Sequence, residues 1–135
     1  MIRKGRFALW RNKEFELISY QRSYYLRSEN PSDTKWGFRE LKGDEYAFIK
    51  PVSIEELEDA YEIIPYAMIL GYRFALAGWD VETGKVILVT VNPFVQDKID
   101  VRPYGRFEYI IEVPLEEIKI EEDRVPILGF EASYR

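Results

Sequence analysis

The stretch that decides the fold is residues 80–91, which read Asp80-Val81-Glu82-Thr83-Gly84-Lys85-Val86-Ile87-Leu88-Val89-Thr90-Val91. Its first five residues are typical of a turn, because Asp and Gly favour tight turn conformations. The apolar and aromatic segment 66–79 precedes this turn, so the pattern predicts a hairpin. Because residues 86–91 are apolar or β-branched at successive positions, we expect a central strand that is covered on both faces.

The first fifty residues show further short strands. The pattern predicts five of them, at residues 6–10, 14–20, 24–28, 36–41 and 45–50. Strand side chains alternate between two faces. We therefore expect the core residues of the first hairpin to be Phe7, Leu9, Phe15 and Leu17. This half of the chain is therefore expected to form an antiparallel meander.

One helix is predicted, over residues 53–64. Ser53 followed by Glu56 is typical of a capping box, and Pro65 ends the segment. Apolar residues at helical spacing define one stripe, made of Ile54, Leu57, Tyr61 and Ile64. Carboxylates define the opposite side, made of Glu55, Glu58, Asp59 and Glu62. We expect one face to pack on the sheet and the other to be anionic.

These elements predict an α+β fold that is mainly β. We expect roughly seven to nine strands in an antiparallel twisted sheet or partly closed barrel, with one packed amphipathic helix. The length predicts a single domain over residues 1–135. No apolar run approaches the roughly 20 residues of a membrane span, and the start is charged without a signal-like apolar stretch. A cytoplasmic protein without a membrane partner is expected, as a monomer or weak homodimer.

The chain contains no histidine and no cysteine, which removes the usual near-neutral proton shuttle, the thiol nucleophile and the common zinc ligands. We therefore expect a binding protein that is not an enzyme, with no cofactor and no metal. Two carboxylate groupings leave a hydrolytic or Ca²⁺-binding alternative open, namely Asp80 with Glu82 and Asp97 with Asp100. Acidic residues in turns are commonplace for backbone reasons, which favours the structural interpretation.

The charge is divided unevenly along the chain. The formal net charge is -5, yet residues 1–50 hold 11 Lys/Arg against 7 Asp/Glu while residues 51–135 hold 8 against 17. Affinity for duplex DNA depends on cations that neutralise phosphates, so duplex DNA is not expected as a partner. A basic protein is a better match as the partner of the acidic residues 51–135.

The basic half interleaves cations with aromatic residues: Tyr20, Arg22, Tyr24, Tyr25, Arg27, Lys35, Trp36, Phe38 and Arg39. Bases stack on aromatic side chains beside cations that meet phosphate, which is how β-sheet platforms bind single strands. The alternative function is therefore a single-stranded RNA-binding or nucleic-acid-binding β-domain. A third is a small-ligand-binding or hydrolytic barrel that uses carboxylates.

Four segments give the chain a layout that resembles a known group of proteins. They are Gly5-Arg6-Phe7-Ala8, the acidic segment 53–62, the hairpin 72–91 and Tyr109-Ile110-Ile111-Glu112-Val113-Pro114-Leu115-Glu116-Glu117-Ile118. This layout is similar to that of the small immunity (antitoxin) proteins encoded beside bacterial polymorphic and contact-dependent toxins. The resemblance implies a bacterial, cytoplasmic, non-enzymatic inhibitor that binds a cognate toxin domain of nuclease-like type and occludes it.

A basic toxin domain would meet an acidic surface on this chain. We expect that surface to comprise Glu58, Asp59 and Glu62 of the helix with Asp97 and Asp100 of the loop that follows residue 91. The expected aromatic anchors are Phe94 and Tyr104 of the same loop, because aromatic side chains carry much of the energy of protein interfaces.

Overall fold

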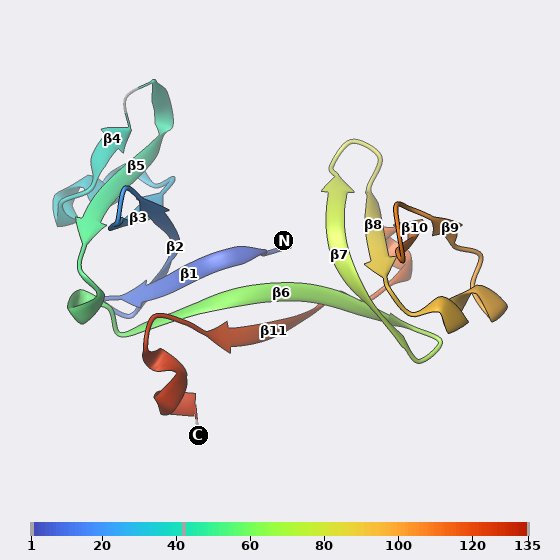
Figure 1. Ribbon diagram of the computed structural model, residues 1–135. Coiled ribbons are helices and arrows are strands. Elements are labelled where there is room, and N and C mark those ends of the chain that lie inside the picture. The colour runs from blue at the N-terminus through green and yellow to red at the C-terminus, as the bar shows by residue number, and fades with distance from the viewer. Residues whose placement is uncertain (1, 42, 135) are drawn as a thin grey trace. The chain divides into compact units, whose positions relative to one another are not determined.

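The computed structural model describes residues 2–41 and 43–134, and the chain divides into two compact units. Unit 1 comprises Met1–Arg3 and Ile64–Asp123, and unit 2 comprises Lys4–Ile63 and Arg124–Arg135. Each unit consists of antiparallel strands (Figure 1), and each has its own cluster of buried apolar side chains. The single domain over residues 1–135 stays a prediction, because it concerns whether the two units fold together.

Unit 2 is an antiparallel sheet in which only the first three strands follow one another as the predicted meander, because the fifth strand lies between the third and the fourth. Its strands are β1 (Gly5–Trp10), β2 (Lys13–Tyr20), β3 (Ser23–Ser28), β4 (Arg39–Leu41), β5 (Asp44–Val52) and the first part of β6 (Asp59–Ile69). They lie in the order β4-β5-β3-β2-β1-β6. The five predicted strands are thereby confirmed, except that the fourth begins at Arg39 because Trp36 belongs to the 3-10 helix η1 (Pro31–Trp36).

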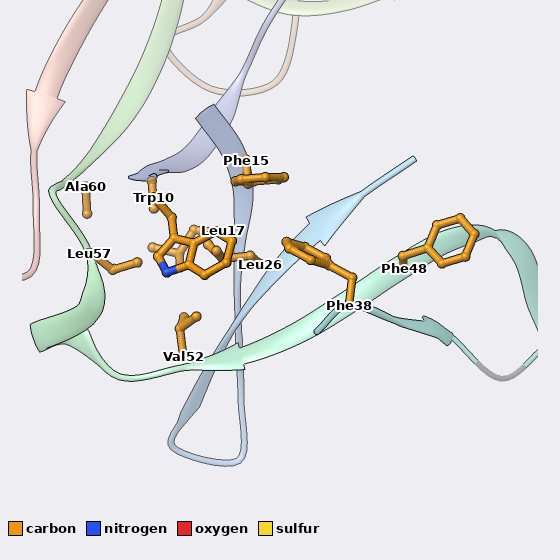
Figure 2. Close-up of a cluster of buried hydrophobic side chains, with 10 residues drawn as sticks. Trp10, Phe15, Leu17, Leu26, Phe38, Phe48, Val52, Leu57 and Ala60 are labelled. Carbon is orange, nitrogen blue, oxygen red and sulfur yellow. The ribbon is translucent and has the colours of Figure 1, made fainter. Parts of the chain in front are cut away.

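The core of unit 2 is aromatic. Trp10, Phe15 and Phe38 lie with their ring centroids 5.0 to 6.2 Å apart and turn toward one another in Figure 2. The predicted core residues Phe15 and Leu17 are buried, whereas Phe7 and Leu9 are only half-buried. The prediction for β1 was wrong by one position, since Ala8 and Trp10 face this core. Phe7 and Leu9 point to the other face of the sheet. In the pairing of β1 with β6, Phe7 is the partner of Tyr61 and Leu9 is the partner of Asp59.

The predicted helix over residues 53–64 does not form. The 3-10 helix η2 spans only Ile54–Glu56, and β6 follows it. The Glu56 carboxylate accepts hydrogen bonds from Ser53 N at 2.7 Å and Ser53 Oγ at 3.2 Å. The bond from the Ser53 backbone holds the pKa of Glu56 below its usual value. Tyr61 and Ile63 are buried on either side of an exposed Glu62. Burial therefore alternates from residue to residue, as in a strand, and this pattern overrides the local helix signal.

Unit 1 is built on the predicted hairpin. Its strands are the second part of β6, β7 (Tyr72–Asp80), β8 (Lys85–Thr90), β9 (Arg102–Pro103) and β10 (Tyr109–Pro114), in the order β6-β7-β8-β10-β9. The hairpin and the central position of β8 are confirmed. The expectation that both faces of β8 are covered was wrong, because Val86, Leu88 and Thr90 are buried while Ile87 is exposed. One face of this sheet packs on the core and the other is open.

Beyond β8 the chain is less irregular than predicted. The segment after residue 91 contains the 3-10 helix η3 (Pro93–Asp97), and η4 (Leu115–Glu117) follows β10. Farther along the chain, β11 (Glu121–Pro126) pairs with β6, and η5 (Phe130–Tyr134) follows. Within the described ranges no helix has the length and apolar character needed to cross a membrane.

The mainly β, antiparallel class is confirmed, and two finer features of the prediction are not. The end strand β4 of unit 2 and the end strand β9 of unit 1 each pair with a single neighbour, so the strand order of neither unit closes into a barrel. Helical structure among residues 2–41 and 43–134 is limited to short 3-10 turns, so no packed amphipathic helix is present there.

Candidate functional site

The hairpin turn between β1 and β2 places a cation at the edge of the unit 2 core. Arg11 and Asn12 form this two-residue turn with φ values of 52° and 62°, the left-handed region that a type I′ turn requires. Asn12 tolerates this region as few non-glycine residues do, whereas a residue such as Arg11 adopts it at a cost of about 1–3 kcal/mol. The Glu58 carboxylate accepts a hydrogen bond from Asn12 N at 2.8 Å, which secures the strained turn.

The helix η1 brings a second segment beside this turn. The Asn30 side chain caps η1 by accepting hydrogen bonds from Ser32 N at 3.0 Å and Ser32 Oγ at 2.9 Å. Gly37 ends η1 at a φ of 96°, and a Cβ there would lie 2.9 Å from the Lys50 Nζ. A larger residue at position 37 would therefore displace Lys50 and change how η1 ends.

Together the two segments enclose a pocket of about 450 Å³, which we call the Trp pocket. It is lined by Trp10, Arg11, Asn12, Lys13, Phe15, Ser32, Asp33, Lys35 and Trp36. All of these residues belong to unit 2. The volume lies within the range of small-ligand sites in proteins.

Cations and indole rings alternate in the Trp pocket. The Arg11 Cζ lies 5.1 Å from the centroid of Trp10 and 4.6 Å from that of Trp36, so one guanidinium contacts both indoles. The Lys35 Nζ lies 5.5 Å from the Trp36 ring. These distances are those of cation–π contacts, which orient a cation without neutralising it. Trp10 is buried, whereas 43% of Trp36 is exposed, so an aromatic surface remains open to a ligand.

A buried carboxylate positions the second cation. Asp33 is 3% exposed, and both of its oxygens lie 3.1 Å from the Lys13 Nζ. Its Oδ2 also accepts a hydrogen bond from Ser28 Oγ at 2.5 Å. The Lys13 Nζ lies 5.2 Å from the Phe15 ring, and half of its side chain is exposed. Asp33 therefore anchors Lys13 at the pocket wall.

This arrangement suits binding of an anion that carries a flat ring. The lining holds three cations, Arg11, Lys13 and Lys35, against the single carboxylate of Asp33. Because both oxygens of that carboxylate are engaged, it is poorly placed to act as a general base. Among residues 2–41 and 43–134, no group of three or more metal-ligating side chains is present that could hold a metal ion.

Sequence reasoning found part of the Trp pocket. Of the aromatic and basic residues singled out in the N-terminal half, Lys35 and Trp36 line it, while Phe38 is buried in the core. The contributions of Trp10, Arg11 and Lys13 were missed. The available signal was their position at a two-residue hairpin turn, where the flanking side chains necessarily lie close together.

The predicted acidic contact residues lie in both units. In unit 2, Glu58 secures the Arg11–Asn12 turn, Asp59 accepts a hydrogen bond from Ala60 N, and Glu62 is exposed on β6. Asp59 and Glu62 point to opposite faces because they are three positions apart on one strand. The shared helix face assigned to these three residues was wrong, and partner binding by them stays a prediction.

The remaining predicted contact residues belong to unit 1. Phe94 and Tyr104 are 69% and 60% exposed, and Asp97 and Asp100 are exposed between them in the sequence. The other carboxylate grouping has a backbone role, since Asp80 Oδ1 accepts a hydrogen bond from Glu82 N at 2.8 Å in the β7–β8 turn.

Comparison with known proteins gives one finding over most of the chain. A family model described as Uncharacterised conserved protein UCP033725 matches residues 2–129. No curated protein and no solved structure matches the chain.

Proposed function

This chain belongs to the family Uncharacterised conserved protein UCP033725, and we propose that it is a non-enzymatic protein that binds single-stranded nucleic acid through the Trp pocket. The observation that carries the proposal is the Arg11 guanidinium in contact with both Trp10 and Trp36. A base would stack against the open surface of Trp36, and its phosphate would meet the pocket cations. Such pairing of rings with cations is how single strands bind without strict sequence readout.

The pocket's shape favours a single strand over a duplex. A base inside a duplex is stacked on both sides and cannot enter a concave site without being flipped out, which costs a few kcal/mol. An unpaired base enters at no such cost. The surrounding charge agrees, because the net charge of -5 opposes the broad phosphate contact that a duplex requires.

Replacing Trp36 by alanine tests this proposal. The Trp36→Ala chain should bind a fluorescein-labelled, 5′-phosphorylated decauridylate more weakly by about 1–3 kcal/mol, a factor of roughly 5 to 150, because one stacking surface is lost. Fluorescence anisotropy at low salt measures the affinity. Wild-type binding should also weaken as salt is added, since phosphate contacts release counterions.

Trp79→Ala is the matched control, because Trp79 is also 43% exposed but belongs to unit 1. Its affinity for the RNA should equal that of the wild type. If the wild type fails to bind, or if both variants lose affinity equally, the Trp pocket is not a nucleic-acid site.

A second candidate function is favoured by the exposed aromatic side chains of unit 1. Phe94 and Tyr104 are largely exposed, and exposed Asp97 and Asp100 lie between them in the sequence. Aromatic anchors with neighbouring carboxylates suit a basic protein partner. We propose as this second function that the chain is a cytoplasmic immunity-type protein whose unit 1 occludes a nuclease-like toxin domain.

Co-expression with the product of the neighbouring open reading frame tests this second function. A Phe94→Ala, Tyr104→Ala double variant should bind that partner more weakly by about 2 kcal/mol or more, roughly 30-fold, because two anchors are removed. Pull-down and calorimetry give the affinity. Tyr20→Ala is the control, since Tyr20 is an exposed tyrosine of unit 2. Undiminished affinity in the double variant would remove this surface from consideration.

A further inference from the structure

Beside the Trp pocket lies a second groove with a different charge. Its volume is about 660 Å³, and it shares Lys13 and Phe15 with the Trp pocket. Three carboxylates line it, those of Glu14, Glu16 and Glu29. The two recesses therefore join at Lys13, with cations and indoles on one side and carboxylates on the other. We call this second recess the acidic groove.

The cations of the acidic groove are already engaged. The Arg27 Nη1 lies 3.4 Å from a Glu16 oxygen and 3.1 Å from a Glu29 oxygen, and the Lys13 Nζ lies 3.1 Å from both oxygens of Asp33. A phosphate that entered the groove would meet three carboxylates, and the two cations of its lining, Arg27 and Lys13, are already paired with Glu16, Glu29 and Asp33. Like charges brought together in this way oppose binding, which is a common source of specificity.

From this arrangement we infer that the Trp pocket takes a nucleotide with a terminal phosphate, and not a nucleotide in the interior of a strand. The inference rests on the proposed binding of nucleic acid at the Trp pocket. An interior nucleotide has a phosphodiester on each side, and one side would be directed into the acidic groove. A terminal phosphate monoester carries a charge of about -1.5 to -2 at pH 7, which suits Arg11 and Lys35, the pocket cations other than Lys13, better than the single charge of a diester.

The terminal phosphate has two sources, a free nucleotide and the end of a strand. The probes that distinguish them are adenosine 5′-monophosphate and three single-stranded RNA hexanucleotides, one with a 5′-phosphate, one with a 3′-phosphate and one with no terminal phosphate. Quenching of tryptophan fluorescence and calorimetry report binding to the full chain. We expect the unphosphorylated hexanucleotide to bind about ten-fold or more weakly than adenosine 5′-monophosphate, because only it lacks the monoester.

Each result has a distinct meaning. Binding of a phosphorylated hexanucleotide at the affinity of the monophosphate identifies a strand end as the ligand. Binding of the monophosphate alone identifies a free nucleotide and contradicts the proposed nucleic-acid function while the terminal-phosphate inference stands. Equal or tighter binding of the unphosphorylated hexanucleotide overturns the inference and leaves the proposed function intact. Binding of none of the four probes overturns both.

A charge-neutral variant tests the acidic groove itself. In a Glu16→Gln, Glu29→Gln double variant, the affinity for the unphosphorylated hexanucleotide should rise by about three- to ten-fold, because repulsion falls and Arg27 is released. The affinity for adenosine 5′-monophosphate should change by less than about two-fold. A Glu55→Gln, Glu62→Gln double variant, which removes two exposed charges of unit 2 outside the groove, is the control. Equal changes in the two double variants would show that only overall charge matters and would contradict the inference.

Discussion

Replacing Phe74 by alanine is expected to lower the free energy of unfolding by about 3–5 kcal/mol, the largest loss we predict for a single substitution. Phe74 lies on β7 and is 0% exposed. It is directly paired with Ala67 of β6 and belongs to a core cluster with Leu76, Val86 and Leu88. Because Ala67 is small and cannot fill the vacated space, the substitution leaves a cavity and forfeits the ring's burial.

Urea unfolding followed by circular dichroism measures this loss. Phe94→Ala is the matched control, since it removes the same ring from an exposed position of unit 1, and surface substitutions typically change stability by about 0.5 kcal/mol or less. A loss below about 1 kcal/mol in Phe74→Ala would contradict the packing described for unit 1.

The tryptophans also distinguish the units, because Trp79 lies in unit 1 and Trp10 in unit 2. If the tryptophans of unit 1 and unit 2 report unfolding at the same urea concentration, the coincident transitions would support the predicted single domain.

Replacing Asp33 by alanine is expected to cost about 2–4 kcal/mol of unfolding free energy. The substitution removes the acceptor of the buried Ser28 hydroxyl and the partner of Lys13. Half of the Lys13 side chain is exposed, so its ammonium can turn toward water, and the cost falls below that of a fully buried ion pair.

The Asp33→Asn variant separates the contribution of the Ser28 hydrogen bond from that of the Lys13 ion pair. The amide keeps the shape of the side chain and one oxygen acceptor, so it should lose roughly half as much stability as alanine. The same urea experiment compares both variants with Glu29→Gln, which neutralises an exposed carboxylate beside η1. Wild-type stability in both Asp33→Asn and Asp33→Ala would contradict the conclusion that the contact between Asp33 and Lys13 holds η1 in place.

The strands were predictable because their signals are local. The hairpin of β7 and β8 follows from a turn at residues 80–84 and from alternating or continuous apolar residues on either side. The segment 53–64 shows the limit of such signals. Its capping residues do form their hydrogen bonds, but a single turn of 3-10 helix satisfies them. Pairing of Tyr61 and Glu62 with Phe7 and Arg6 is a long-range contact that local propensity cannot reveal.

The Trp pocket was only partly predictable for a related reason. Lys13 and Asp33 are 20 residues apart, and their contact depends on how η1 packs against the β1–β2 hairpin. The sequence shows a basic and aromatic region, and it does not show which rings enter the core. Phe38 and Trp36 are two residues apart, yet one is buried and the other is half-exposed. Alternation within strands could not separate them, because neither residue belongs to a strand.

Under the proposed binding at the Trp pocket, the left-handed backbone at Arg11 sets thermostability against affinity for the ligand. Glycine adopts a φ of 52° without steric cost, so selection for heat resistance alone would favour glycine at this hairpin tip. The same exchange would delete the guanidinium that bridges Trp10 and Trp36. Engineering for heat resistance should therefore leave position 11 unchanged and seek added stability elsewhere, because the proposed function depends on the Arg11 side chain.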